Sequence, residues 1–290
     1  MNLGHVIRRY SLVVFVVAVG VVLFGVFYLT PMVFLLRTSF WQYSSTSGST
    51  RYMIPVPTLE NYAEVLTGAY LNYSIMTIRI GLVCTIAALI LSYPLAYWFA
   101  KYNGHAKLKR IVLMTLIASF LVGTIARVFA WYSMLTGTGF VAAVLSLFGV
   151  GEVHFIGTEF AIELCQVQYL MSIATLSLIS PLRNVDPRLE EASKSLGAEE
   201  IRTFINVTLP LSLPGVVAAS LLCFAVSVSA FVTPMVLGAG GILMVSNLVY
   251  TYYLDIMNYP LGSAFAVILL LFSFFSMYVL EKALLSRVRT

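Results

Sequence analysis

Six long apolar runs constrain this chain more than any other feature of its sequence. A helix needs about 20 apolar residues to cross the hydrocarbon of a membrane, and the runs lie at residues 11–36, 74–100, 111–135, 160–182, 212–235 and 261–281. Of the 290 residues, 60% are hydrophobic and 10% are charged, which is too apolar for one soluble core or for a disordered chain. The sequence therefore predicts an all-α polytopic membrane protein, one transmembrane domain over residues 1–290 with six transmembrane helices.

The basic residues are divided unevenly between alternate loops. Thirteen of the 17 Lys and Arg residues fall on one side, whereas only Arg37 and Arg51 fall on the other. Cytoplasmic loops carry an excess of Lys and Arg, so we expect both termini and the loops 101–110 and 183–211 to be cytoplasmic. The first run is longer than the apolar region of a signal peptide, about 7–15 residues, and predicts an uncleaved helix.

The outer loops contain three further segments of interest. We expect a short surface helix at 59–66 and a re-entrant or interfacial helix at 140–148, which is too short to span a membrane. We also expect 244–253 to dip toward the bilayer. We find no convincing internal repeat, which disfavours a secondary transporter built from inverted repeats.

The loop at 183–211 carries the densest charge in the chain and strong helix signals. Asp186 can cap a helix, Pro187 suits the first helical position, and Glu190 favours the positive first turn. Gly197 is a typical helix stop, and a second short helix at 198–207 would end before Pro210. The loop is therefore predicted to form two helices joined at a glycine.

The order of residues in this loop resembles a known motif. Glu191-Ala192-Ser193, then Gly197, then Val207-Thr208-Leu209-Pro210 is similar to the EAA loop of permeases from type I ABC importers. The spacing agrees throughout, with Ser in place of the second Ala and Val in place of Ile. A solvated loop that happens to be helical is the alternative.

The resemblance implies a role and a set of partners. In that family the loop docks into a groove on a separate ATPase and couples ATP hydrolysis to movement of the spans. The implied partners are a second permease subunit, two ATPase subunits that bind ATP and Mg, and a soluble periplasmic binding protein, all around a multi-pass protein of the bacterial inner membrane. The implied coupling residues are Glu190, Glu191, Ala192, Ser193, Leu196, Gly197, Ala198, Leu209 and Pro210.

Further segments resemble the spermidine/putrescine branch of this family. They are Leu59-Glu60-Asn61-Tyr62, Ser92-Tyr93-Pro94-Leu95-Ala96-Tyr97-Trp98, Arg127 with Trp131, Gly137-Thr138-Gly139 and Tyr259-Pro260-Leu261-Gly262. Polyamine uptake is the implied function, but permeases for thiamine, phosphonates, iron or sulfate share some of these matches and stay alternatives.

Polar side chains inside the spans are candidates for the translocation pathway, since ionisable groups are costly there. Arg127 lies 16 residues after Ile111, about 24 Å along one continuous helix, and Glu163 lies near the outer end of the fourth run. We expect these two to pair, either at the mouth of the pathway or as a structural link. The candidate pathway residues are Arg127, Trp131, Tyr132, Glu163, Gln166, Tyr169, Phe231 and Thr233.

Other polar side chains in the spans have structural explanations. Small Ser residues of the fifth run, Ser227 and Ser229, are explained equally by close helix packing. Arg79 is expected to extend outward from its span. Since acidic residues are so sparse in the spans, the partner permease or the binding protein is expected to carry most of the recognition of a polycation.

Several kinds of function have no support in this sequence. It contains no G-x-x-x-x-G-K-[ST] motif for ATP, and Cys84, Cys165 and Cys223 lie inside apolar runs without metal-ligand spacing. We therefore predict buried thiols rather than a disulfide or metal site, no catalytic residue, no cofactor bound by this chain and no nucleic-acid partner. An autonomous ion-coupled transporter and a channel are the competing classes.

Overall fold

The computed structural model describes residues 14–15, 17–45, 51–102, 104–149 and 154–285. The chain divides into two units. The first comprises Met1–Thr67 and Val249–Ile268, and the second comprises Gly68–Leu248 and Leu269–Thr290. The prediction of one transmembrane domain over residues 1–290 stays a prediction.

The first unit contains a long apolar helix, a β-hairpin and a short helix. The helix, Val17–Ser39, is long and apolar enough to cross a membrane. The elements of the first unit, in chain order, are the π-helix η1 (Gly25–Leu29), α2 (Thr30–Ser39), β1 (Trp41–Ser45), β2 (Arg51–Pro57), α3 (Glu60–Val65), the π-helix η3 (Thr251–Asp255) and the first part of α14 (Tyr259–Leu285).

The α3 helix confirms the helix predicted at 59–66 and is fixed to the end of α2. The Asn61 amide donates hydrogen bonds to the carbonyl oxygens of Ser39 and Trp41, at 3.0 and 2.8 Å. The hydroxyls of Tyr62 and Ser39 lie 2.5 Å apart. Because Asn61 is only 6% exposed, this helix is anchored rather than lying free on a surface.

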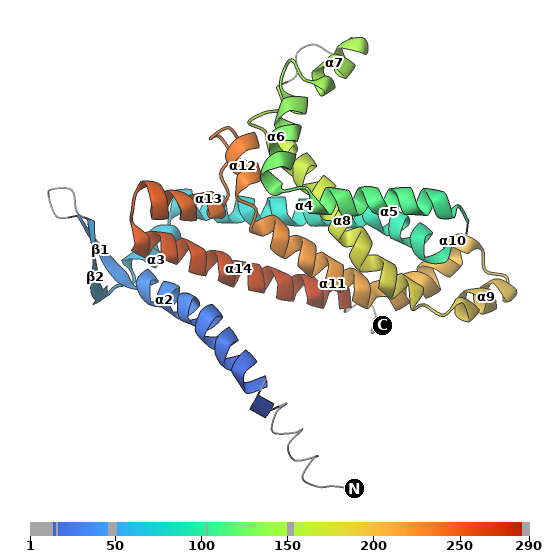
Figure 1. The fold of residues 1–290 in the computed structure, drawn as a ribbon, viewed down its shortest axis with the longest axis horizontal. Helices are drawn as coiled ribbons and strands as arrows, with labels where there is room; N and C mark the ends of the chain where they lie inside the picture. The colour runs from blue at the N-terminus through green and yellow to red at the C-terminus, as the bar shows by residue number, and fades with distance from the viewer. Residues whose placement is uncertain (1–13, 16, 46–50, 103, 150–153, 286–290) are drawn as a thin grey trace, which may run out of the picture. The chain divides into compact units, whose positions relative to one another are not determined.

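The second unit is built around α4, α8 and α11, which pack against one another (Figure 1). Its elements in chain order are α4 (Gly68–Lys101), α5 (Ala106–Leu121), α6 (Thr124–Leu135), α7 (Phe140–Leu147), α8 (Glu159–Arg183), α9 (Pro187–Ser195), α10 (Glu200–Thr203), the π-helix η2 (Phe204–Thr208), α11 (Leu209–Val228), α12 (Val232–Leu237), α13 (Val245–Tyr250), which runs on into the first unit, and the last part of α14.

Small residues let the three central helices approach closely. A Cβ atom on Gly81 would lie 2.7 Å from a methyl carbon of Val228, and one on Gly215 would lie 2.3 Å from the Cβ of Pro181. Glycine at a helix crossing is a typical device in membrane proteins, where packing rather than water drives association. The two glycines therefore set how closely α11 approaches α4 and α8.

The predicted fold class is confirmed, since six helices within the described residues are long and apolar enough to span a membrane. Four of the predicted spans agree with observed helices to within a few residues over their described parts. Part of the first predicted span, residues 11–13 and 16, lies outside the described residues. The orientation of the termini stays a prediction.

The third predicted span, 111–135, is wrong as one helix. α5 ends at Leu121, and Val122 and Gly123 have extended backbone before α6 begins at Thr124. Glycine has low helix propensity, which favours the break at this point. The spanning segment found here is instead Thr124–Leu147, which includes the helix expected at 140–148.

The fifth predicted span, 212–235, is also displaced. Helical residues run from Glu200 to Val228, so the short helix expected to end before Pro210 continues into the span. Pro210 lies in the first turn of α11 and follows the π-helix η2; a π turn relieves the loss of a backbone donor at proline. At the other end, residues 229–231 leave the helix before α12 begins.

Candidate functional site

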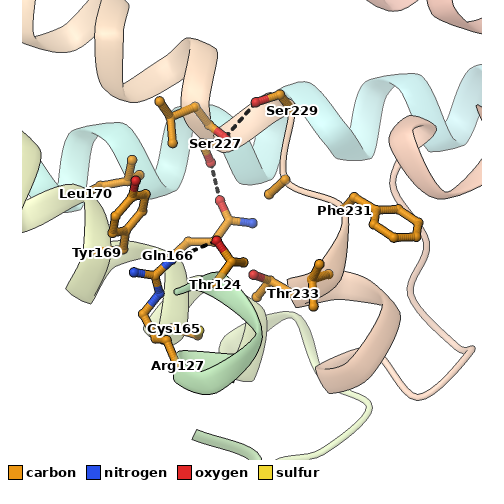
Figure 2. A pocket seen from close by; sticks show the side chains of 13 residues that line it. Thr124, Arg127, Cys165, Gln166, Tyr169, Leu170, Ser227, Ser229, Phe231 and Thr233 are labelled. Atoms are coloured by element: carbon orange, nitrogen blue, oxygen red, sulfur yellow. Dashed lines mark hydrogen bonds between the residues drawn. The ribbon is translucent and has the colours of Figure 1, made fainter. Parts of the chain in front are cut away.

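A cavity of about 320 Å³ lies in the second unit, where both helix breaks meet α8 (Figure 2). Three segments supply its walls: the start of α6, the N-terminal half of α8, and the unwound stretch between α11 and α12 with the helix ends beside it. The lining residues are Thr124, Arg127, Cys165, Gln166, Tyr169, Leu170, Val226, Ser227, Ser229, Ala230, Phe231, Val232 and Thr233. The described lining contains one basic side chain and no acidic one.

The unwound stretch between α11 and α12 is held by side chains of α13. Ser246 donates a hydrogen bond to the carbonyl oxygen of Ala230 at 2.7 Å, and the Asn247 amide donates to that of Phe231 at 3.0 Å. Irregular backbone at membrane depth is tolerated only where it is buried in protein or lines a cavity. The break is therefore a built feature of the cavity wall.

Arg127 fills one side of the cavity. Its guanidinium lies 3.8 Å from the centre of the Tyr169 ring, and it donates to the carbonyl oxygens of Ser119 and Val122, both at 3.4 Å. A third donor faces the Thr124 hydroxyl at 3.3 Å. The two carbonyls belong to the end of α5, where helix carbonyls lack partners and carry partial negative charge.

A buried polar pair also lines the cavity. The Ser227 hydroxyl donates to the Gln166 side-chain oxygen (Figure 2), and these side chains are 1% and 5% exposed. The Gln166 amide nitrogen also faces the Met244 sulfur at 3.9 Å. The pair ties α8 to α11 and leaves hydroxyl and carbonyl groups on the cavity wall.

Five of the eight candidate pathway residues line this cavity: Arg127, Gln166, Tyr169, Phe231 and Thr233. Trp131 instead packs against the apolar core, and neither Tyr132 nor Glu163 is among the lining residues. The structure therefore brings together most of the predicted set, and the pathway role itself stays a prediction.

The predicted ion pair between Arg127 and Glu163 is wrong. Within the described part of the chain Arg127 has only neutral partners. The predicted depth of Arg127 assumes one continuous helix from Ile111, and the break at Gly123 removes that helix. The ion pair on this part of α8 joins Glu159 to Arg79, whose side chain is 58% exposed.

Sequence reasoning missed two of the polar lining residues, Thr124 and Cys165. Thr124 reaches the cavity only because α6 starts there, and Gly123 was the signal for that start. Cys165 was predicted to be a buried thiol, and it is 1% exposed. All three cysteines are free and buried, in agreement with the sequence.

The loop at 183–211 forms the predicted helix and glycine turn. The Asp186 side chain accepts a hydrogen bond from the Arg188 backbone at 2.9 Å, Pro187 occupies the first turn, and α9 ends at Ser195. Gly197 has a φ of +84°, a conformation that favours glycine. The local sequence signals are therefore sufficient to predict α9 and the glycine turn that follows it.

A half-buried ion pair fixes α9 to the body of the second unit. The Lys101 ammonium lies 3.1 Å from the Glu190 carboxylate, and the two side chains are 14% and 16% exposed. Lys101 also donates to the carbonyl oxygen of Val185 at 2.9 Å, and the Thr208 hydroxyl donates to Glu190 at 2.7 Å. One carboxylate thus connects α4, α9 and η2.

Exposed apolar side chains occur on α9 and on the residues that follow it: Leu189 lies in α9, Leu196 directly after it, Ile201 in α10 and Ile205 in η2. The exposed fractions of Leu189, Leu196, Ile201 and Ile205 are 47%, 89%, 71% and 53%. The predicted coupling residues divide accordingly: Glu191, Ala192, Leu196 and Gly197 are exposed, whereas Glu190, Ser193, Ala198, Leu209 and Pro210 are partly buried. No described contact tests the coupling role.

Comparison with known proteins places the fold. The chain matches a crystallised bacterial alginate ABC transporter, solved with its substrate-bound periplasmic protein, with a TM-score of 0.74 over 100% of this chain and 99% of that chain at 13% identity. The fold is that of an ABC importer permease.

The sequence comparison agrees with the fold. The chain is 28% identical over 263 residues to the spermidine/putrescine permease PotB of Salmonella typhimurium strain SL1344, covering 90% of this chain and 89% of that protein. It is 27% identical over 245 residues to PotB of Escherichia coli K12, covering 84% and 87%. No family model matches the chain. The resemblance to spermidine/putrescine permeases thus extends over most of both proteins.

Proposed function

We propose that this chain is a permease subunit of a binding-protein-dependent ABC importer that takes up polyamines across the bacterial inner membrane. The observation that carries the proposal is the 28% identity to PotB over 90% of the chain, joined to the ABC importer permease fold. The chain would form half of the translocation pathway and perform no chemistry of its own.

The partners follow from this assignment. A second, similar permease would complete the pathway, with the cavity of Figure 2 facing it. Two ATPase subunits would bind ATP and Mg at the cytoplasmic face, and a periplasmic binding protein would deliver the substrate. The periplasmic protein that accompanies the alginate transporter supports such an assembly.

The exposed face of α9 is suited to transmit the ATP cycle. The apolar side chains on α9 and directly after it, chiefly Leu196 at 89% exposure, have the character of anchors that fill a groove on a partner. Because Glu190 and Lys101 fix α9 to α4, movement of the ATPase would move the membrane helices with the loop.

Reconstitution tests the proposed substrate. The chain would be assembled in vesicles with a candidate partner permease, ATPase and binding protein from the same organism, and entry of radiolabelled spermidine and putrescine measured. We expect uptake that needs ATP and all four components. ATP-driven uptake of thiamine, phosphonate or sulfate without uptake of polyamines would refute the substrate, and uptake by this chain alone along an ion gradient would refute the importer.

Substitution on α9 tests the docking surface separately. Leu196→Asp should insert normally but fail to retain the ATPase during purification, since a charge replaces an exposed anchor that no described residue packs against. Ser195→Asp adds the same charge at the neighbouring position and should retain the ATPase. Equal retention by both variants would contradict the proposed surface.

A further inference from the structure

Three kinds of group surround the Arg127 guanidinium, and each one binds cations. The Tyr169 ring presents its face at 3.8 Å, and the carbonyl oxygens of Ser119 and Val122 lie at the negative end of α5. The Thr124 hydroxyl adds a third acceptor. An alkylammonium ion would be recognised by the same three kinds of group.

The hydrogen bonds of the Arg127 guanidinium are weak for a buried charged group. Its hydrogen bonds measure 3.3–3.4 Å, beyond the usual N–H···O range of about 2.7–3.2 Å. All of its described partners are neutral, although Arg127 is only 7% exposed. It also borders open volume, the cavity of about 320 Å³, which provides space for the side chain to move when it is displaced.

The rest of the cavity suits the remainder of an amine chain. The hydroxyl-bearing side chains of Ser227, Ser229 and Thr233 and the side chain of Phe231 also line this cavity (Figure 2). These groups offer oxygen acceptors and an aromatic face but no carboxylate. Such a site binds an amine weakly, which suits a pathway from which the substrate must leave again.

We propose that the Tyr169 ring and the end of α5 form a subsite for a substrate ammonium group, and that Arg127 is a tethered competitor filling it when substrate is absent. Exchange of one cation for another keeps a cation beside the α5 carbonyls, so the buried dipoles never lose their partner. The subsite takes primary and secondary alkylammonium ions; the identity of the polyamine rests on the proposed function.

Equilibrium binding to the assembled complex in nanodiscs, without the binding protein, tests this subsite. Radiolabelled spermidine and n-butylammonium are the probes. Arg127→Gln should bind each about tenfold more tightly than the wild type, because a competitor worth roughly 1–2 kcal/mol has been removed. Arg183→Gln removes an exposed arginine at the other end of α8 and should leave binding unchanged.

Tyr169 supplies the second half of the test. In the Arg127→Gln background, Tyr169→Leu should abolish the tenfold gain, whereas Tyr169→Phe should keep it because the ring face remains. A gain that survives Tyr169→Leu, or no gain in Arg127→Gln, would overturn the proposal. If Arg127→Gln does not assemble, Arg127→Lys serves instead. It should show a smaller gain, since an ammonium stacks less well on the ring, and no gain would again overturn the proposal.

The opposite role for Arg127 has a distinct signature. If Arg127 binds an acidic group, the wild type will bind glutarate and Arg127→Gln will lose it, which would overturn the subsite. The outcome is separate from the proposed function. A complex that imports no polyamine, yet gains n-butylammonium binding on Arg127→Gln, would refute the substrate and keep the subsite.

Discussion

At the scale of single residues, close packing at Gly215 makes a testable demand. A Cβ atom there would overlap Pro181 of α8, at 2.3 Å from its Cβ. Gly215→Ala should therefore lower stability by about 1–3 kcal/mol through overpacking, although alanine favours helix by about 1 kcal/mol. Thermal unfolding of the purified complex in detergent measures the change.

A matched glycine gives the control for that substitution. Gly20 is also helical, and a Cβ atom on it would have nothing within 4 Å. Gly20→Ala should leave the melting temperature unchanged or raise it. Equal melting temperatures for the two variants would show that α8 and α11 do not meet at Gly215.

The sequence reveals such residues only in part. Five of eight pathway candidates line one cavity, because polar side chains inside apolar runs are conspicuous. Glu163 and Arg127 were paired wrongly, since their distance depends on a helix break that hydropathy does not register. Thr124 was missed for the same reason, because its place in the cavity depends on where α6 begins.

At the scale of elements, α9 depends on the ion pair between Lys101 and Glu190. Both side chains are largely shielded from water, and removing one partner of a shielded pair leaves an uncompensated charge. Lys101→Met should therefore loosen α9, so that uptake falls at least fivefold while ATP hydrolysis continues. The ratio of solute transported to ATP hydrolysed measures this uncoupling.

A second ion pair on the same element is the control. Lys194 and Glu200 lie 3.2 Å apart, but their side chains are 51% and 87% exposed, and such pairs contribute little. Lys194→Met should leave the ratio unchanged. The reversed pair, Lys101→Glu with Glu190→Lys, should recover part of the coupling that Lys101→Met loses. A wild-type ratio of solute to ATP in Lys101→Met would exclude the tether.

Elements were predictable where their signals are local. The Asp186 cap, Pro187 and Gly197 lie within a dozen residues and defined α9 correctly. The sequence does not predict the hairpin of β1 and β2, because its register depends on pairing between two separate segments, Trp41–Ser45 and Arg51–Pro57. The sequence does not predict the extension of α10 into α11, because a proline such as Pro210 favours the end of a helix, whereas here it lies in the first turn of α11 after a π-helix.

At the scale of the whole molecule, six apolar runs and the basic residues predicted both the number of spans and their orientation. In the part of the chain that the structure describes, six helices are long and apolar enough to span a membrane, which confirms the number. The orientation depends on 13 basic residues on one side, a signal read during insertion rather than a contact within the fold. It needs an experiment in cells.

The native cysteines should give that experiment a low labelling background. Cys84, Cys165 and Cys223 are 0–1% exposed, so a membrane-impermeant maleimide should hardly label the wild-type chain. Gln42→Cys on the exposed face of the hairpin and Ser195→Cys at the exposed end of α9 place one thiol on each predicted side.

In intact spheroplasts, Gln42→Cys should react with the maleimide and Ser195→Cys should not. After the membrane is permeabilised, Ser195→Cys should react as well, because α9 would then meet the reagent from the cytoplasmic side. Labelling of Ser195→Cys in intact spheroplasts would place α9 away from any cytoplasmic ATPase. That single result would invert the orientation and remove the physical basis for coupling through this loop.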